Sequence, residues 1–350
     1  MSLAFSRPRM VLPGADYPQR ATDGILVLQR GENASTDYYL RPRLRVPGAA
    51  AEIADLSADP GDCRLLQDAS ASSLMVVFCR YASPAWLDAL DRIRPRLARV
   101  VFFTDDDLPE MIRAPEVPAA ARGKVALHYA AHVDRLSALC SELWVSTPEL
   151  AHRYVEAHPG LLAPLPEAEP PGPAPADADL VVYHGTDVHG RERRFVLEVA
   201  RLLQARSPAA RLEVAGDRSL ARAALGVGNV EIAPQLPWPD YLQAQRGRRA
   251  AISLAPLFPS KLNDARAAVK AFDAARLGAA GIYADAPAYR GHVRDGQDGL
   301  LLPMEPSAWA EAIGSLLADP ARRIALAEAA RARLAMALKA DRGFPAAPEG

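Results

Sequence analysis

Polar and charged residues recur at regular intervals between positions 262 and 278, in the stretch LNDARAAVKAFDAARLG. The spacing predicts a helix, and at about 100° per residue a strip about 80° wide carries Asn263, Arg266, Lys270 and Asp273. Two cations fall in its first two turns, where the helix dipole is already positive and favours a carboxylate instead. Such a face either binds an anion or forms ion pairs along a solvated surface, and the spacing alone fits both.

A second candidate anion site follows the apolar run LVVYH at 180–184. A turn with Gly185 and Thr186 comes next, and then a predicted helix that opens with Arg191, Arg193 and Arg194. Free backbone N–H groups at a helix start bind anions, and glycine lets a phosphate approach closely. Two cationic segments of this kind in one half of the chain predict a site for a diphosphate. The types of His184 and His189 fit either a contact to the ligand or a structural role in the turn.

Motifs for other cofactors and for metals fit less well. A dinucleotide-binding enzyme needs G-x-G-x-x-G directly after a strand, and none of the predicted strands is followed by it. The histidines of HYAAH (128–132) have metal-like spacing, but Tyr129 stands where a zinc protease needs Glu. The run Asp105-Asp106-Asp107 contains a D-x-D of the kind that binds a metal and a nucleotide, yet Asp before LPEMI also fits a helix N-cap. We favour the cap, or a role in binding an acceptor.

The elements that must position these residues alternate along the chain. Predicted strands of the first half are 25–29, 74–79, 100–103 and 143–145, and predicted helices include 84–93, 126–140 and 148–157. Continuous apolar strands between amphipathic helices indicate a parallel sheet covered on both faces. In such sheets ligands collect at the carboxyl ends of the strands.

The second half repeats the alternation, with strands predicted at 180–184, 211–216, 230–233, 251–257, 281–285 and 300–302. Its first helix puts Phe195, Val199 and Leu202 on one stripe. The run 161–179 between the halves contains six prolines, which suit a stiff spacer. We therefore predict a Rossmann-like N-terminal domain at 1–165, a linker at 166–179 and a Rossmann-like C-terminal domain at 180–320. The last helix and tail, 321–350, are expected to pack back on the first domain.

Composition sets further bounds. A chain of 350 residues has room for two domains, and a net charge of −1 argues against a nucleic-acid partner. Three widely spaced cysteines form neither a disulfide framework nor a zinc site, and they suit a reducing compartment. The sequence lacks a signal-peptide pattern and an apolar run of about 20 residues. We expect a cytoplasmic protein.

The ordered motifs resemble those of group-1 glycosyltransferases, the family-4-like retaining enzymes of the GT-B fold. Tyr183 to Thr186 is similar to the family's Y-H-G-T, and the stretch at 262–278 is similar to F-N-x-x-K-S-x-x-K-x-x-E-x-x-x-x-G. The family's Y-x-x-x-x-x-x-G-x-x-G-L-L element resembles the segment from Tyr289 to Leu301. In the first half FFTDDDL and SELWVSTPEL are also similar to family motifs. Departures are Arg266 for lysine, Asp273 for glutamate and no acid eight residues before Asp273.

The resemblance implies an α/β fold of the GT-B type, with two Rossmann-like α/β/α domains facing each other across a cleft. It implies transfer of a sugar, with retention of configuration, from a nucleotide-diphosphate sugar as co-substrate, without a further cofactor or metal. Arg266 and Lys270 then stabilise the leaving diphosphate. Residues that bind the donor are His184, Gly185, Thr186, Asn263 and Asp273.

The acceptor side is predicted on the N-terminal domain, at Arg30, Gly31 and Asp106, although a plain turn also fits the first two. The acceptor is a glycan, a lipid-linked molecule or a small molecule. Arginine clusters at 246–249 and 321–339 allow peripheral contact with the inner face of a membrane. Two alternatives stay open: a nucleotide-sugar epimerase, and a non-catalytic GT-B module that binds a sugar nucleotide or glycan.

Overall fold

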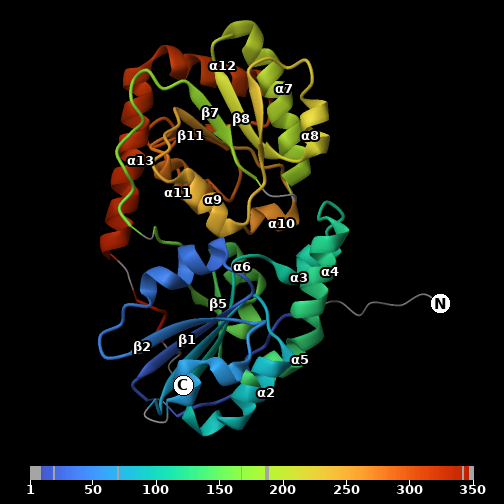
Figure 1. Cartoon of the computed structure of the whole chain (residues 1–350), viewed down its shortest axis with the longest axis vertical. Coiled ribbons are helices and arrows are strands. Elements are labelled where there is room, and N and C mark those ends of the chain that lie inside the picture. Colours follow the sequence, from blue (N-terminus) through green and yellow to red (C-terminus); the bar gives the residue numbers. More distant parts are fainter. Residues whose placement is uncertain are drawn as a thin grey trace, which may run out of the picture. The chain divides into compact units, whose positions relative to one another are not determined.

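A computed structural model describes residues 9–18, 20–68, 71–166, 168–185, 189–340 and 343–346. The described residues fall into two compact units, one within Met1–Glu167 and Arg342–Gly350, the other within Ala168–Asp341. Each unit is built on one six-stranded sheet with helices beside it (Figure 1). The domain limits drawn from the sequence stay a prediction.

The sheet of the first unit is parallel throughout, in the order β2-β1-β3-β4-β5-β6. Its strands are β1 Gly24–Gln29, β2 Ala50–Asp55, β3 Leu74–Cys79, β4 Leu97–Thr104, β5 Glu142–Val145 and β6 Gly160–Leu161. Its α-helices are α1 Arg64–Gln67, α2 Pro84–Arg92, α3 Leu108–Arg113, α4 Ala119–His128, α5 Val133–Leu139 and α6 Pro148–Arg153. The four strands predicted here are confirmed. The sequence did not reveal β2, whose alanines and acids lack an apolar run, nor the two-residue β6.

The second unit has the same kind of sheet, in the order β12-β11-β10-β7-β8-β9, again all parallel. Its strands are β7 Leu180–Tyr183, β8 Arg211–Gly216, β9 Val230–Pro234, β10 Ile252–Ala255, β11 Ala280–Ala284 and β12 Leu300–Leu302. Its helices are α7 Gly190–Arg206, α8 Arg218–Ala223, α9 Trp238–Gln245, α10 Lys261–Asp264, α11 Val269–Arg276, α12 Pro306–Ala318 and α13 Pro320–Ala340. All six predicted strands of this half are confirmed.

Burial on both faces of the second sheet explains why its strands are continuous apolar runs. Val181 and Val182 are neighbours in β7, yet they belong to two separate apolar clusters, because successive side chains point to opposite faces. Helix α7 contributes Phe195 and Val199 to the larger cluster. The stripe predicted on this helix is wrong at its end, since Leu202 is 42% exposed and Leu203 is buried instead.

Two helices predicted in the first unit are longer than the observed ones. The stretch 126–140 is divided, because α4 ends at His128, a 3-10 turn spans Ala130–His132, and α5 begins at Val133. The stretch 148–157 is α6 followed by a 3-10 turn at Val155–Ala157. Amphipathic spacing continues across both breaks, so the sequence pattern does not reveal them.

The described part of the proline-rich run, residues 168–179, belongs to the second unit. The Ala174 N–H donates to the Gly278 carbonyl at 2.7 Å, and Arg323 donates to the carbonyls of Pro175 and Ala176 at 2.8 and 2.9 Å. Gly278 has φ +62°, and a Cβ there would lie 2.4 Å from the carbonyl oxygen of Gly172. This position therefore requires glycine.

The short segment 343–346 lies within the first unit, whereas α13 is part of the second. Phe344 stacks on Trp144 with ring centres 5.2 Å apart. Arg43 and Arg99 donate to the carbonyls of Gly343 and Pro345 at 3.0 and 2.8 Å. These contacts anchor the segment next to β4 and β5.

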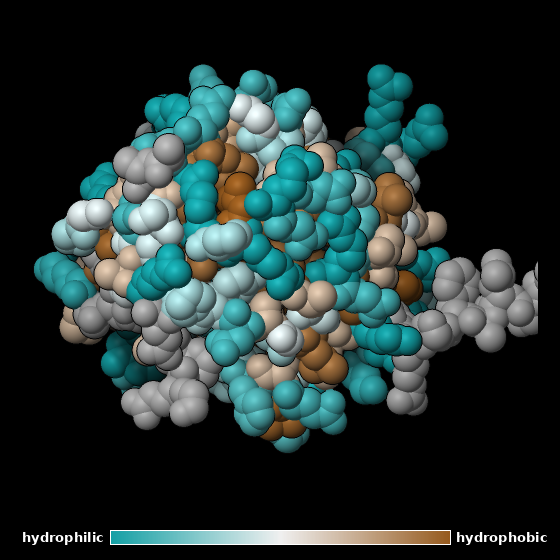
Figure 2. Space-filling view, turned by 90° about the horizontal axis from the view of Figure 1, so that it is seen from below, coloured by the Kyte–Doolittle hydropathy of each residue, from teal (hydrophilic) through white to brown (hydrophobic). Residues whose placement is uncertain are grey.

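Surface composition bears on the predicted membrane contact. The face seen in Figure 2 is mostly hydrophilic, with small apolar patches separated by polar residues. Among the helices of the described residues, none is both long enough and apolar enough to cross a bilayer. Contact with a membrane surface stays a prediction.

Candidate functional site

The strand order of the second sheet defines where a ligand should lie. From β7 the chain adds β8 and β9 on one side, then returns to add β10, β11 and β12 on the other. The order therefore switches between β7 and β10, and in open α/β sheets ligands bind at the carboxyl ends of the strands at such a point. His184 and Gly185 follow β7, and the stretch from 262 onwards follows β10.

The single helix predicted for 262–278 is wrong. The stretch forms α10 and α11 with a break between Asp264 and Val269. The hydroxyl of Ser260 caps α10 by accepting the Asn263 N–H at 3.2 Å, and the Asn263 amide donates to the Phe258 carbonyl at 2.8 Å. These two hydrogen bonds fix the start of α10. After Asp264 the Arg266 N–H donates to the Asn263 carbonyl at 3.2 Å and the Val269 N–H to the Ala267 carbonyl at 2.9 Å, so the i→i−4 pattern of a helix is interrupted. Arg266 therefore lies in the break, before α11, and not in a helix start.

Lys270 lies in the first turn of α11 and reaches across to β7. Its ammonium donates to the main-chain oxygen of His184 at 2.6 Å and to the Asp273 carboxylate at 3.0 Å. Arg276 lies 3.4 Å from the other Asp273 oxygen. Asp273 is buried between the two cations, so it fixes the position of the Lys270 ammonium. Its predicted contact with a ribose stays a proposal.

The imidazole of His184 is held from both sides. Its Nε2 lies 2.8 Å from Glu213 and its Nδ1 lies 3.1 Å from the Tyr241 hydroxyl. Arg248 binds both Glu213 oxygens at 3.0 and 2.7 Å. The hydrogen bond from His184, and then Arg248, lower the pKa of Glu213 to about 2 despite its burial. This network keeps the end of β7 in place, which is where the His184 carbonyl receives Lys270.

Sequence reasoning missed Glu213, Tyr241 and Arg248. The one available signal was a glutamate in the middle of the apolar run RLEVAG, because a charged residue inside a parallel strand is buried and needs a partner. The partners come from α9 and from the loop before β10, which are distant in sequence.

Arg266 is oriented by a second chain of polar groups. It donates to His189 Nε2 at 3.1 Å, and His189 Nδ1 lies 3.8 Å from Glu192. Burial and then the nearby cations lower the pKa of His189, although Glu192 opposes the shift, so a neutral ring accepts the hydrogen bond from the arginine. Burial alone would raise the pKa of Glu192, but hydrogen bonds from His189 and the Phe258 N–H hold it below its usual value.

The turn after β7 is only partly described, since Thr186 lies outside the described residues. The Gly185 carbonyl accepts from Gln235 at 3.1 Å and from Arg193 at 3.4 Å. The structure thus brings His184, Lys270 and Asp273 into one hydrogen-bonded group and pairs Arg266 with His189. Asn263 points to Phe258 and acts within its own turn.

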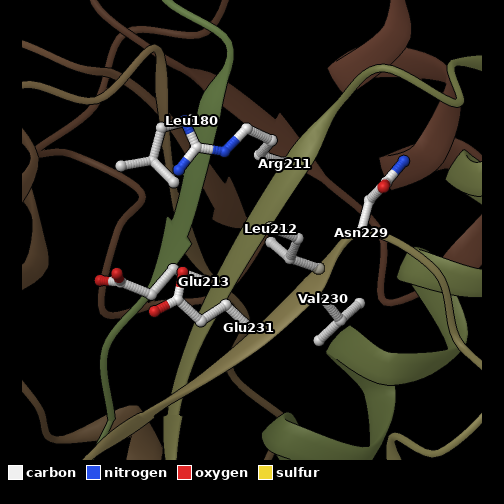
Figure 3. Close-up of a pocket in the computed structure, with 7 residues that line it drawn as sticks. All are labelled: Leu180, Arg211, Leu212, Glu213, Asn229, Val230 and Glu231. Carbon is white, nitrogen blue, oxygen red and sulfur yellow. The ribbon is translucent and has the colours of Figure 1, made fainter.

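A cavity of about 350 Å³ lies elsewhere on the same sheet (Figure 3). It lies toward the amino ends of the strands and is lined by Leu180, Arg211, Leu212, Glu213, Asn229, Val230 and Glu231. In Figure 3 the carboxylates of Glu213 and Glu231 lie side by side. None of the predicted donor-site residues lines this cavity, so we do not assign the donor to it.

Comparison with known proteins gives both sequence and structural matches. Residues 179–319 match the model of the family described as glycosyl transferases group 1. Anabaena Alr3699/HepE, solved with UDP and glucose, superimposes with a TM-score of 0.54 at 13% identity, over 89% of this chain and 95% of that one. Sucrose-phosphate synthase from Thermosynechococcus elongatus gives 0.55 at 14% identity, over 90% and 94%. No curated protein sequence matches.

The fold is GT-B. Two parallel six-stranded α/β units and the likeness over nearly the full length of both structures decide this. The family match covers 141 of the 350 residues, all in the second GT-B unit, which is the unit with the cationic group described above.

The first GT-B unit carries the residues predicted on the acceptor side, also at carboxyl ends of strands. Arg30 and Gly31 follow β1, where Gly31 has φ +61° and donates its N–H to Asp55 at 2.6 Å. Asp106 follows β4 and lies 3.0 Å from Arg80. The predicted N-cap is confirmed at Asp107, whose carboxylate accepts the Glu110 N–H at 3.0 Å.

Arg80 is a residue of the first unit that sequence reasoning missed. It follows β3, has φ +68°, and pairs with Asp105 at 3.4 Å as well as with Asp106. Burial raises the pKa of Asp105, although Arg80 opposes the shift. The two histidines of HYAAH are separated by the end of α4, and among the described residues no group of three metal-ligating side chains forms.

Proposed function

We propose that this protein is a glycosyltransferase that uses a nucleotide-diphosphate sugar as donor, and that the second unit binds the donor. The observation that carries this proposal is the position of Lys270, whose ammonium lies against the His184 carbonyl at the switch point of a sheet. This is the region whose sequence matches group 1 glycosyl transferases. Arg266 lies in the adjoining break between α10 and α11 and adds a second cation.

The chemistry follows from the charges of this group. As the sugar leaves, negative charge develops on the diphosphate, and fixed cations lower the energy of that transition state. Arg266 offers a forked donor and Lys270 a point charge, so together they neutralise the leaving group without a metal ion. Gly185 and Thr186 supply neutral donors, Asn263 holds the turn before Arg266, and Asp273 binds the ribose hydroxyls while it orients Lys270.

Retention of configuration is part of the proposal. In the described part of this site the carboxylates linked to Lys270, Arg266 and their partners are Glu192, Glu213 and Asp273, and each accepts hydrogen bonds or ion pairs from the protein. An arrangement of this kind favours charge stabilisation over attack by a carboxylate. The acceptor hydroxyl then gives its proton to the departing phosphate oxygen on the same face of the sugar.

A nucleotide panel tests the donor site. We expect one of UDP, GDP, dTDP, CDP and ADP to raise the melting temperature of the wild type but not that of Lys270→Ala. The similar Anabaena protein was solved with UDP, so UDP is the first choice. A ligand at a hundred times its Kd adds about 2.7 kcal/mol, or about 5 to 10 °C for a domain of this size. Lys339→Ala is the matched control, because Lys339 is exposed in α13.

Activity is then measured with the corresponding nucleotide sugars. Release of the nucleoside diphosphate that depends on an added acceptor, is unaffected by EDTA and gives the anomer of the donor supports the full proposal. An inverted product contradicts retention, and loss of activity with EDTA contradicts metal independence. If no nucleotide raises the melting temperature of the wild type, the donor site is wrong.

A second candidate is a non-catalytic module that binds a sugar nucleotide or glycan. The pairing of Asp273 with both Lys270 and Arg276 favours it, because a carboxylate held by two cations has less freedom to bind a ribose. Nucleotide binding without transfer of the sugar to any of the acceptors added in the activity assay supports this candidate. A location in the cytoplasm and a lipid-linked acceptor remain predictions.

A further inference from the structure

Three basic side chains lie around one aromatic ring in the first unit, and a fourth lies within electrostatic reach of two of them. The Lys124 ammonium lies 5.3 Å from the centre of the Tyr81 ring, and the Arg80 guanidinium lies 5.6 Å from it. The His128 imidazole meets the same ring edge-on, with centres 6.2 Å apart. Arg30 completes the group, since its charge acts on both Lys124 and His128. We call these four basic residues with Tyr81 the Tyr81 cluster.

The position of the Tyr81 cluster is that of a ligand site. In the first sheet the strand order switches between β1 and β3, because β2 was added on one side of β1 and β3 on the other. Arg30 directly follows β1, and Arg80 and Tyr81 directly follow β3. The carboxyl ends of strands at a switch point are where open α/β sheets bind ligands.

The backbone at Arg80 is strained. Its φ is +68°, which is rare for a long side chain, and the Tyr81 N–H donates to the Cys79 carbonyl at 2.9 Å across it. Residues held in this region are strained and concentrate at functional sites. The turn directs Arg80 toward Asp105 and Asp106 and places Tyr81 beside Lys124.

The charges of the Tyr81 cluster are not balanced. Asp105 and Asp106 pair with Arg80, whereas neither Lys124 nor Arg30 has an ion pair or hydrogen bond among the described residues. Desolvation and then Arg80 and Arg30 lower the pKa of Lys124. Asp55 lies near Arg30, but it accepts N–H groups of Gly31 and Ser57. Lys124 and Arg30 are both exposed, so water screens their mutual repulsion, and their combined positive potential attracts an anion from solution.

We infer that the Tyr81 cluster binds a phosphate group carried by the acceptor, with Lys124 and Arg30 as its direct ligands. The inference rests on the proposed function for the identity of that molecule as an acceptor. A forked guanidinium and an ammonium suit the oxygens of a phosphate, and the Tyr81 ring supplies an apolar wall beside it. The phosphate belongs either to a soluble phosphorylated sugar or to a lipid phosphate.

The chain offers a direct probe, because it has only four lysines, Lys124, Lys261, Lys270 and Lys339. Reductive methylation with ¹³C-formaldehyde keeps their charge and gives one NMR signal each, assigned through Lys→Arg variants. We expect glucose 6-phosphate to shift the Lys124 signal with an affinity at least tenfold higher than that of glucose. Arg30→Ala should weaken this binding at least tenfold, and Lys339→Ala should not change it.

The lipid arm uses phosphatidylcholine vesicles with and without farnesyl phosphate, and phosphatidylglycerol vesicles as the anionic control. Co-sedimentation that needs farnesyl phosphate and falls at least tenfold in Lys124→Ala supports a lipid phosphate, whereas a response to glucose 6-phosphate alone supports a soluble one. The inference is overturned if glucose and glucose 6-phosphate act alike on Lys124 and Lys124→Ala sediments with farnesyl phosphate like the wild type. Wild type that sediments with phosphatidylglycerol as strongly as with farnesyl phosphate excludes a specific site for a lipid phosphate.

The NMR signals of Lys270 and Lys124 distinguish failure of the proposed function from failure of this inference. UDP should shift the Lys270 signal, and Arg30→Ala should leave that shift unchanged, because Lys270 and Arg30 lie in different units. If none of the five nucleotides shifts the Lys270 signal while glucose 6-phosphate shifts the Lys124 signal, the phosphate site is supported and the donor site is contradicted.

Discussion

The Lys270 ammonium lies 2.6 Å from the main-chain oxygen of His184, and this contact joins the first turn of α11 to the end of β7. Lys270→Met should lower kcat about 10²- to 10³-fold, because removal of one preorganised charge at a developing anion has that effect. Initial rates with a saturating nucleotide sugar measure it. Lys339→Met, at an exposed position in α13, should keep the wild-type rate. Equal rates for all three proteins would remove Lys270 from the mechanism.

Glu213→Gln should destabilise the protein by about 3 kcal/mol near neutral pH, as expected for a carboxyl whose pKa falls from 4.5 to about 2 on folding. A lowered pKa gives stability that is complete above about pH 4.5 and is lost as the pH falls toward 2. The difference between wild type and variant should therefore be constant from pH 5 to 8 and shrink below pH 4.5. Urea unfolding at several pH values measures it, and a difference that does not change with pH would contradict this account.

Arg80→Ala should cost about 3 kcal/mol or more at pH 8, because it removes the guanidinium that pairs with both Asp105 and Asp106. Burial already raises the pKa of Asp105, so this carboxyl gains a proton more readily in the variant. A carboxyl whose pKa is raised on folding destabilises the folded protein more as the pH rises. The destabilisation caused by Arg80→Ala should therefore be smaller at pH 5 than at pH 8. Urea unfolding at both pH values measures it.

Arg113→Ala is the control for that comparison, because the pair between Arg113 and Glu110 is exposed and should contribute at most about 1 kcal/mol. If Arg80→Ala costs no more than Arg113→Ala, or costs the same at pH 5 and pH 8, the buried ion-pair interpretation of Arg80 does not hold.

Gly278→Ala should destabilise the second unit by more than about 1 kcal/mol. Its φ is +62°, and the added Cβ would approach the Gly172 carbonyl oxygen to 2.4 Å. Gly123→Ala is the matched control, since Gly123 lies inside α4 and a Cβ added there would have nothing within 4 Å. The control should gain up to about 1 kcal/mol. Thermal melts compare the two, and an unchanged melt for Gly278→Ala would show that the turn rearranges.

The sequence by itself determined the fold class and all strands of the described residues except β2 and β6. Continuous apolar runs such as LMVVFC and LVVY have few alternatives to a buried parallel strand, and the ten strands predicted from such runs are present. The sequence also placed Lys270 and His184 among the candidate residues, because cations and glycine-containing turns after strands have a direct physical interpretation.

Only the tertiary structure decided how those residues meet. The alanines of 262–278 favour one helix, but α10 ends at Asp264, where the Arg266 N–H donates to the Asn263 carbonyl and the Val269 N–H to the Ala267 carbonyl, and Arg266 lies in the break. The partners of His184 come from β8 and α9, and the two arginines whose charges act on Lys124 follow β1 and β3, at sequence separations that no local pattern covers. Local propensity fixes which segments become strands, whereas the strand order fixes which loops share a switch point, and with it the charges that meet there.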